Sequence, residues 1–172
     1  MTTIAIKDGI LACEGKETHS DGFIVSWNTE KVLLHNDAYY GFCGSTHHIL
    51  VVMDTIKANG ELTDVSPDIT LQFIKMPKKG PPLLLWLENG HLTQEIIGKE
   101  GMAIGSGMNY AMVAMSCGKS AVEAVKEAIK WDCFSGGKVK SYSFNKPAKK
   151  VKKPKAVDMG VFDDWSEPDD KA

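Results

Sequence analysis

Short apolar runs separated by turn residues dominate the pattern of this chain. The runs 2–6 and 10–13 flank Asp8-Gly9, a dipeptide that favours a tight turn between two strands. Two later segments repeat this arrangement, so we predict three β-hairpins, and the first places position 2 at the start of a strand. The other two hairpins are expected at 31–35 with 38–43, around Asn36-Asp37, and at 83–87 with 91–97, around Asn89-Gly90.

Helical periodicity appears in other parts of the chain. A helix is predicted over 46–58, because apolar residues recur there at the spacing of one helix face. A shorter helix is predicted from about Pro67 to Met76, before a stretch rich in proline and glycine. The segment 109–133 is interrupted by a glycine, so two helices are expected there. The second has Ser120 and Glu123 at the two positions of a capping box.

A last strand is predicted over 138–144, after which the composition changes sharply. The stretch 146–155 is rich in lysine and proline, and the chain then becomes acidic, with the run DDWSEPDD near its end. Such segments bury little apolar surface, so we expect residues 146–172 to form a flexible, basic-then-acidic tail. Residues 1–145 would then make one domain, and its order of strands and helices indicates an α+β fold with helices covering sheet faces.

Composition and charge narrow the range of functions. The formal net charge of −2 gives no overall attraction to nucleic acid or to an anionic membrane. No run approaches the roughly 18 apolar residues of a membrane span, and the start of the chain lacks the features of a signal peptide, so we expect a cytoplasmic protein. No metal or other cofactor is expected, because the cysteines are widely spaced and form no CxxC pair or zinc-type cluster. They are Cys13, Cys43, Cys117 and Cys133.

Thr2 is a candidate nucleophile on condition that Met1 is removed. A threonine hydroxyl is a weak nucleophile, but an N-terminal threonine carries its own base, an α-amine with a pKa of about 8. Thr2 is small enough for the preceding methionine to be removed, which would expose that amine. Threonine is common at the second position of proteins, so this observation carries weight only together with other residues.

Several ordered blocks in the first half resemble the proteasome β-subunit family, and especially its HslV-like N-terminal threonine peptidases. The opening ThrThrIle and the block 8–14 resemble the first hairpin of that family, and Glu14 falls on its acidic position. Lys31, ahead of ValLeuLeu, resembles the family lysine beside the threonine. The block GlyPheCysGly at 41–44 resembles the glycine pair before the first long helix, and Gly41 falls on the position that offers its amide to the oxyanion.

The second half supplies three more positions of the resemblance. AlaIleGlySerGly at 103–107 is similar to the family's loop into its third helix, where Ser106 falls on the active-site serine. The block 118–137 is similar to the fourth helix and the Asp-x-x-Ser-Gly motif that follows it. Asp132 and Ser135 fall on the two polar positions of that motif.

The resemblance extends from Thr2 to about Phe144, and it implies a fold and an activity. The implied fold is a compact version of the four-layer αββα sandwich of N-terminal nucleophile (Ntn) hydrolases, because the first hairpin, the interval from 31 to 41 and the second helix are all shortened. The implied activity is that of a threonine-type endopeptidase acting on peptides or unfolded proteins. Its members form closed homo-oligomeric rings of about six or seven subunits, single or doubled, and an ATP-dependent unfoldase is the partner expected by resemblance.

The resemblance also implies a division of roles. Thr2 Oγ would attack the peptide carbonyl while the α-amine accepts its proton. Lys31 would supply a positive charge, and Glu14 would hold Lys31 in position. The amide of Gly41 would stabilise the oxyanion. The amine and the water would be oriented by Ser106, Asp132 and Ser135. Glu14 can reach Lys31 only if the shortened hairpin keeps its side-chain alternation, since a shift of one residue would turn Glu14 away.

Two other functions compete with this interpretation. The chain could be a catalytically silent structural subunit or an Ntn amidase acting on a small molecule, because one fold can host several functions. A nucleic-acid-binding role would rest on the lysine-rich stretch 146–155, but no aromatic residues for base stacking accompany it. Val161, Phe162 and Trp165 in the acidic end could instead form a short docking motif.

Overall fold

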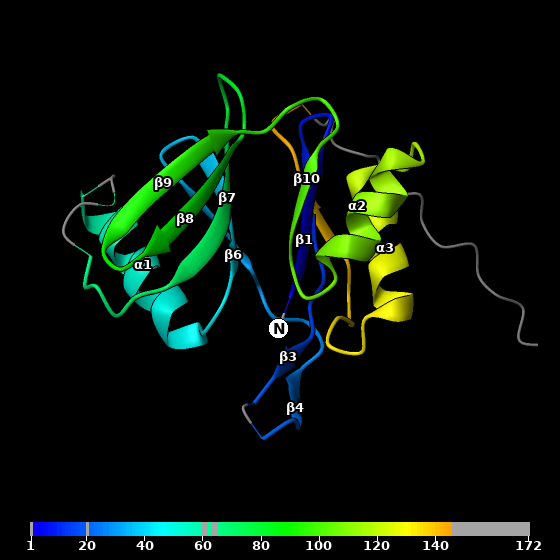
Figure 1. Cartoon of the computed structure of the whole chain (residues 1–172), viewed down its shortest axis with the longest axis horizontal. Helices are drawn as coiled ribbons and strands as arrows, with labels where there is room; N and C mark the ends of the chain where they lie inside the picture. Colours follow the sequence, from blue (N-terminus) through cyan, green and yellow to red (C-terminus); the bar gives the residue numbers. More distant parts are fainter. Residues whose placement is uncertain (1, 20, 60–61, 63–64, 146–172) are drawn as a thin grey trace, which may run out of the picture.

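The structure, a computed structural model, describes residues 2–19, 21–59, 62 and 65–145 (Figure 1). The predicted tail, 146–172, lies outside the described residues, and so does Met1. The described elements are β1 (Thr3–Lys7), β2 (Ile10–Cys13), β3 (Glu17–Thr18), β4 (Ile24–Ser26), β5 (Val32–His35), β6 (Ala38–Cys43), α1 (Thr46–Asn59), β7 (Leu71–Pro77), β8 (Leu83–Glu88), β9 (His91–Ile96), β10 (Met102–Gly105), α2 (Met108–Ser116), α3 (Ala121–Trp131) and β11 (Lys140–Tyr142).

The three predicted hairpins are confirmed as the antiparallel pairs β1–β2, β5–β6 and β8–β9. Both central residues of each turn have positive φ: 51° and 69° at Asp8-Gly9, 46° and 54° at Asn36-Asp37, and 51° and 76° at Asn89-Gly90. Two consecutive positive φ angles define a type I′ turn, whose twist matches that of the flanking strands. Local turn chemistry therefore determines where these strands begin and end.

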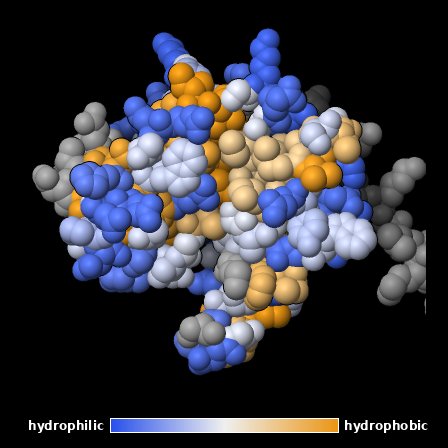
Figure 2. Space-filling model, in the orientation of Figure 1, coloured by the Kyte–Doolittle hydropathy of each residue, from blue (hydrophilic) through white to orange (hydrophobic). Residues whose placement is uncertain are grey.

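The strands form two main antiparallel sheets and one small one. The four-stranded sheet has the order β10-β1-β2-β11, and the five-stranded sheet has the order β5-β6-β7-β8-β9. The pair β3–β4 forms a separate hairpin that projects from the body of the molecule (Figure 1). Figure 2 shows apolar surface on this projection, in keeping with the exposed side chains of Phe23, Val25 and Trp27.

Three apolar clusters join the sheets and helices in layers. Ile4 and Ile6 of β1 point toward Ile74 and Leu84 of the other sheet, so one cluster fills the space between the two sheets. Ala5 lies between them in sequence and faces the opposite way, toward α2 and α3. The third cluster packs α1 against the five-stranded sheet. The order of layers is therefore α1, five-stranded sheet, four-stranded sheet, and the pair α2–α3 (Figure 1).

The helices agree with the sequence in three of four cases. The helix expected over 46–58 is α1, and the two expected over 109–133 are α2 and α3. The capping box of α3 is confirmed, because Ser120 Oγ accepts from the amide of Glu123 while the Glu123 carboxylate accepts from the amide of Ser120. None of the described helices combines the length and apolar character needed to cross a membrane.

The short helix predicted from Pro67 to Met76 is wrong, because Leu71–Pro77 forms strand β7 in the interior of the five-stranded sheet. β7 pairs with β6 on one side and β8 on the other, and both faces of the sheet are covered. Leu71 and Phe73 face α1, while Ile74 and Met76 face the other sheet. A strand buried on both faces has a nearly continuous apolar sequence, which helical periodicity can imitate.

Candidate active site

Thr2 lies directly before β1 and is buried, with its backbone beside the loop that follows β10. Its carbonyl accepts a hydrogen bond of 2.8 Å from the amide of Ser106 and one of 3.4 Å from Ser106 Oγ. Gly105 has φ 94°, and a Cβ atom there would overlap the Thr2 carbonyl. The glycine therefore permits both the turn and the close approach that fixes the backbone of Thr2.

Lys31, just before β5, directs its ammonium group at the hydroxyl of Thr2. Lys31 Nζ lies 2.8 Å from Thr2 Oγ1, 2.6 Å from Glu14 Oε1 and 2.7 Å from the carbonyl oxygen of Lys16. An ammonium group has three N–H donors, and these three oxygens can accept all of them. Only 8% of the Lys31 side chain is exposed, so water screens its charge little. The charge therefore acts strongly on the nearby hydroxyl of Thr2.

Glu14 follows β2 and is completely buried, with 0% exposure. Its Oε1 accepts from Lys31 and, at 3.4 Å, from the amide of Thr3. Its Oε2 accepts from the amides of Lys16 at 2.7 Å and Gly136 at 3.0 Å. A buried carboxylate requires such partners, and these link the first hairpin to Lys31 and to the loop after α3. The shortened hairpin has thus kept the alternation that turns Glu14 toward Lys31.

Asp132, the C-cap residue of α3, accepts hydrogen bonds from three groups of the candidate site. Its Oδ2 accepts from Ser135 Oγ at 2.6 Å and from Ser106 Oγ at 2.7 Å, and its Oδ1 accepts from the amide of Phe134 at 3.1 Å. Burial alone would raise the pKa of Asp132, but the hydrogen bonds from Ser135, Ser106 and Phe134 outweigh it and lower that pKa below its ordinary value. Asp132 is therefore a carboxylate at neutral pH.

The structure brings six of the seven predicted residues into one hydrogen-bonded region, and Gly41 stands apart from them. Gly41 lies within β6, opposite Val32 on β5 and Ile74 on β7. A Cβ atom at this position would lie 3.2 Å from the side chain of Ile4, so glycine also serves the close packing of the two sheets. Among the described residues, no hydrogen bond joins Gly41 to the other six.

Sequence reasoning missed three contributors to this region. Thr3 Oγ1 lies 2.5 Å from Ser135 Oγ, and the repeated threonine at positions 2 and 3 is a signal that could have pointed to it. Lys16 and Gly136 act through backbone atoms, by holding Glu14 and, for Lys16, by accepting from Lys31. Backbone contacts of this kind do not depend on the type of side chain and leave no signal in a single sequence.

Cys43, at the end of β6, is an alternative nucleophile near Thr2. Its Sγ lies 3.0 Å from the Cβ position of Gly105, which itself touches Thr2. Burial raises the pKa of the Cys43 thiol, so the thiol stays protonated and is a poor nucleophile. Within the described part of the chain, no group of His, Cys, Asp or Glu residues is arranged to hold a metal ion. The geometry thus favours chemistry at the Thr2 hydroxyl.

Solved structures with the same fold are known. HslV from Trypanosoma brucei, a eukaryotic HslV, matches with a TM-score of 0.61 and 18% identity over 82% of this chain and 97% of that chain. BPH from Thiobacillus denitrificans matches with a TM-score of 0.58 and 20% identity over 82% and 95% of the two chains. The complex of BPH with epoxomicin matches with a TM-score of 0.57 and 20% identity over 82% and 96%.

No protein-family model matches the sequence, and no curated protein sequence matches it. At identities of 18–20%, the likeness to the solved structures establishes the fold and nothing finer. The chain therefore has the mixed helix and sheet fold of HslV and BPH, and the resemblance to HslV-like proteins is confirmed at that level.

Proposed function

We propose that this chain is a threonine-type endopeptidase of the HslV-like branch of the proteasome β-subunit family, with Thr2 as its nucleophile once Met1 has been removed. Its layers would then be the compact αββα sandwich of Ntn hydrolases. The observation that carries the proposal is the position of Lys31 Nζ, 2.8 Å from Thr2 Oγ1 and held there by the buried carboxylate of Glu14. A lysine on a protein surface has no reason to be fixed in this way.

The first chemical stage is attack on the peptide carbonyl. Thr2 Oγ forms a bond to the carbonyl carbon while its proton passes to the free α-amine, directly or through water. The ammonium of Lys31 favours the developing alkoxide, because opposite charges attract strongly where water is excluded. Collapse of the tetrahedral intermediate breaks the C–N bond, and the departing amine takes up the proton.

The second stage hydrolyses the ester formed on Thr2. Water attacks the acyl carbon and gives a proton to the α-amine, the C–Oγ bond breaks, and the amine returns that proton to Thr2 Oγ as the new carboxyl end of the peptide leaves. Ser106 and Asp132 position the residue throughout, since Ser106 holds the Thr2 carbonyl and donates to Asp132. Ser135 completes this side by donating to the same carboxylate oxygen. The resemblance implies oxyanion stabilisation by the amide of Gly41, a contribution of about 3–4 kcal/mol for a single donor. Gly41 lies inside β6 opposite Val32 and Ile74, so this role requires its amide to leave the strand ladder.

The test compares three variants of the full chain with fluorogenic peptides as substrates. Thr2→Ala should abolish cleavage, whereas Thr2→Ser should retain part of it, because serine keeps the hydroxyl and the neighbouring amine. Lys31→Ala should lose nearly all activity while Met1 is still removed, as mass spectrometry of the N-terminus would show. Thr55→Ala is the matched control, since Thr55 lies on α1 and its hydroxyl bonds only to the backbone of the same helix.

Epoxomicin provides a second readout, because BPH has been solved in complex with it. Epoxomicin is an epoxyketone, and an epoxyketone that reacts with both the hydroxyl and the amine of an N-terminal threonine should label this chain at Thr2 and leave Thr2→Ala unlabelled. Equal cleavage by the wild type and Thr2→Ala would refute the proposal. A wild type with a free Thr2 that neither cleaves nor becomes labelled would favour the silent structural subunit.

A further inference from the structure

The outer faces of the two main sheets are covered unequally. Within the described residues, α2 and α3 lie on the four-stranded sheet, whereas α1 alone lies on the five-stranded sheet (Figure 1). The register places Leu83 opposite Ile96, and Leu87 opposite Leu92, on the face that α1 occupies. Ile96 is nevertheless 66% exposed, and Leu92 is 39% exposed. Among the described residues, Leu92 and Ile96 therefore leave an apolar strip exposed at the edge of this sheet.

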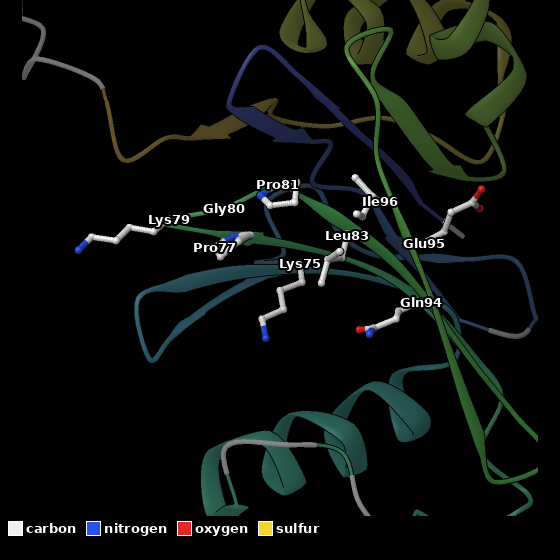
Figure 3. Close-up of a pocket in the computed structure, with 9 residues that line it drawn as sticks. All are labelled: Lys75, Pro77, Lys79, Gly80, Pro81, Leu83, Gln94, Glu95 and Ile96. Atoms are coloured by element: carbon white, nitrogen blue, oxygen red, sulfur yellow. The ribbon is translucent and has the colours of Figure 1, made fainter.

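A groove of about 480 Å³ lies over this strip (Figure 3). Leu83 and Ile96 contribute apolar surface, and Lys75 and Lys79 contribute two positive charges against the single carboxylate of Glu95. A second hollow of about 250 Å³ next to α1 shares Lys75 in its lining, so the two spaces adjoin. Their combined size suits two or three large side chains. The groove thus calls for an apolar ligand that carries negative charge.

One segment of this chain has that chemistry. Residues 158–170 contain six carboxylates and no basic residue, and Val161, Phe162 and Trp165 lie among those acidic residues. The preceding stretch 146–155 contains six lysines, so the lysines of the groove would repel it. Charge complementarity therefore selects the acidic segment over the basic one.

The length of the chain allows this segment to reach the groove. The ring of Phe144, next to the last described residue, packs on Tyr39 with the ring centroids 4.6 Å apart. Tyr39 pairs with Met76 on β7, and Met76 is the direct neighbour of Lys75. The stretch from 145 to Val161 can span roughly 50 Å when extended, whereas a domain of this size has a radius of gyration of about 15 Å. The acidic segment can therefore pass around the sheet edge to the opposite face.

We propose that the groove beside α1 binds the acidic segment 158–170 of its own chain, with Phe162 and Trp165 against Leu83 and Ile96 and the carboxylates beside Lys75 and Lys79. The segment covers the apolar strip that α1 leaves exposed. The lysine-rich stretch acts as the connection between the domain and this docked end. This role does not depend on the chemistry at Thr2.

Photo-crosslinking in the full chain tests the proposal. A benzoylphenylalanine in place of Ile96 should crosslink to peptides that contain Phe162 or Trp165. The same residue in place of Val113 is the matched control, because Val113 is 64% exposed and lies on α2, on the other side of the molecule. In an equal mixture of isotopically heavy and light chains, the crosslinks should stay within chains of one label.

Charge exchange keeps the test decisive if a variant is perturbed in another way. Lys75→Glu together with Lys79→Glu should reduce the crosslink yield at position 96 several-fold, and adding Asp163→Lys with Asp164→Lys should restore it. Absence of a crosslink from position 96, a crosslink to another protein, or a crosslink between heavy and light chains would overturn the proposal. A yield that is unchanged by the lysine substitutions would overturn it as well.

Discussion

Glu14 has a different energetic role from the surface carboxylates of the chain. It is buried together with Lys31, and removing two charges from water costs several kcal/mol that the pair and its hydrogen bonds must offset. The four hydrogen bonds to its two oxygens provide that compensation. Such a pair adds little net stability when complete, but loss of one partner leaves a buried charge without compensation.

We therefore predict that Glu14→Ala lowers the free energy of unfolding by about 3–5 kcal/mol, in addition to its effect on activity. Urea denaturation at neutral pH measures this change. Lys78→Ala is the control, because Lys78 forms a solvent-exposed pair with Asp37 whose loss should cost less than about 1 kcal/mol. Adding Lys31→Met to Glu14→Ala should recover part of the loss, since no unpaired charge remains. Equal losses for Glu14→Ala and Lys78→Ala would contradict a buried pair.

Asp132 leads to a prediction about pH. Its pKa in the folded protein lies below the ordinary value of 3.8, so the unfolded chain binds the proton more tightly. Asp132 therefore stabilises the fold fully above pH 3.8, and this contribution is lost as the pH falls through the lowered pKa. The difference in unfolding free energy between the wild type and Asp132→Asn should be constant from about pH 5 to 8 and shrink below about pH 4. Urea denaturation over this pH range tests it, and a difference that grows at low pH would show the opposite sign.

At the scale of single elements, the N-terminal cap of α3 determines where that helix begins. The side chain of Ser120 satisfies an amide at the start of the helix that has no partner within the helix. Ser120→Ala should lower the free energy of unfolding by about 1 kcal/mol. Ser116→Ala is the control, because that exposed hydroxyl donates to the carbonyl of Val113 at the end of α2 and should matter by less than about 0.5 kcal/mol. Urea or thermal denaturation measures both variants. Equal losses of unfolding free energy for Ser120→Ala and Ser116→Ala would contradict the role of the cap.

The same contrast explains which elements the sequence could predict. Hairpins and capped helices were predictable because their signals lie within a few residues, as at Asn89-Gly90 and Ser120. β7 was not, because its identity depends on pairing with β6 and β8 far along the chain. The block 103–107 resembles a loop of the family, yet β10, which includes its first three residues, pairs with β1. Long-range pairing overrides local pattern at both places.

The candidate site also combines residues that the sequence could identify with contacts that only the folded chain determines. The resemblance identified the side chains that meet around Thr2, but only the register of the folded hairpin turns Glu14 toward Lys31. The backbone partners Lys16 and Gly136 were out of reach, because any residue type could supply those atoms. Sequence patterns thus specify which side chains have the right chemistry, and the strand pairing specifies which of them come together.

At the scale of the whole molecule, different layers of the fold supply the residues of the candidate site. Thr2 and Glu14 flank the hairpin β1–β2, which belongs to the sheet between the five-stranded sheet and the pair α2–α3. Lys31 comes from the five-stranded side, and Asp132 comes from the end of α3. Both partners can meet Thr2 only when the four-stranded sheet is packed against the five-stranded sheet on one side and against α2 and α3 on the other. A change that loosens either interface between layers should therefore reduce activity before it unfolds the chain.

The last prediction concerns assembly. The projecting hairpin β3–β4 leaves Phe23, Val25 and Trp27 exposed, and it lies directly after Lys16, whose backbone holds Glu14 and Lys31 (Figure 2). Exposed apolar surface of this kind marks a contact with another protein, and closed symmetry is the usual outcome when that protein is a second copy. We expect sedimentation velocity at micromolar concentration to show one species of about six or seven subunits, or twice that number, as the resemblance implies. A chain truncated after Asn145 should assemble equally, because the resemblance extends only to about Phe144. A clean monomer for both forms would count heavily against a peptidase that encloses its own chamber.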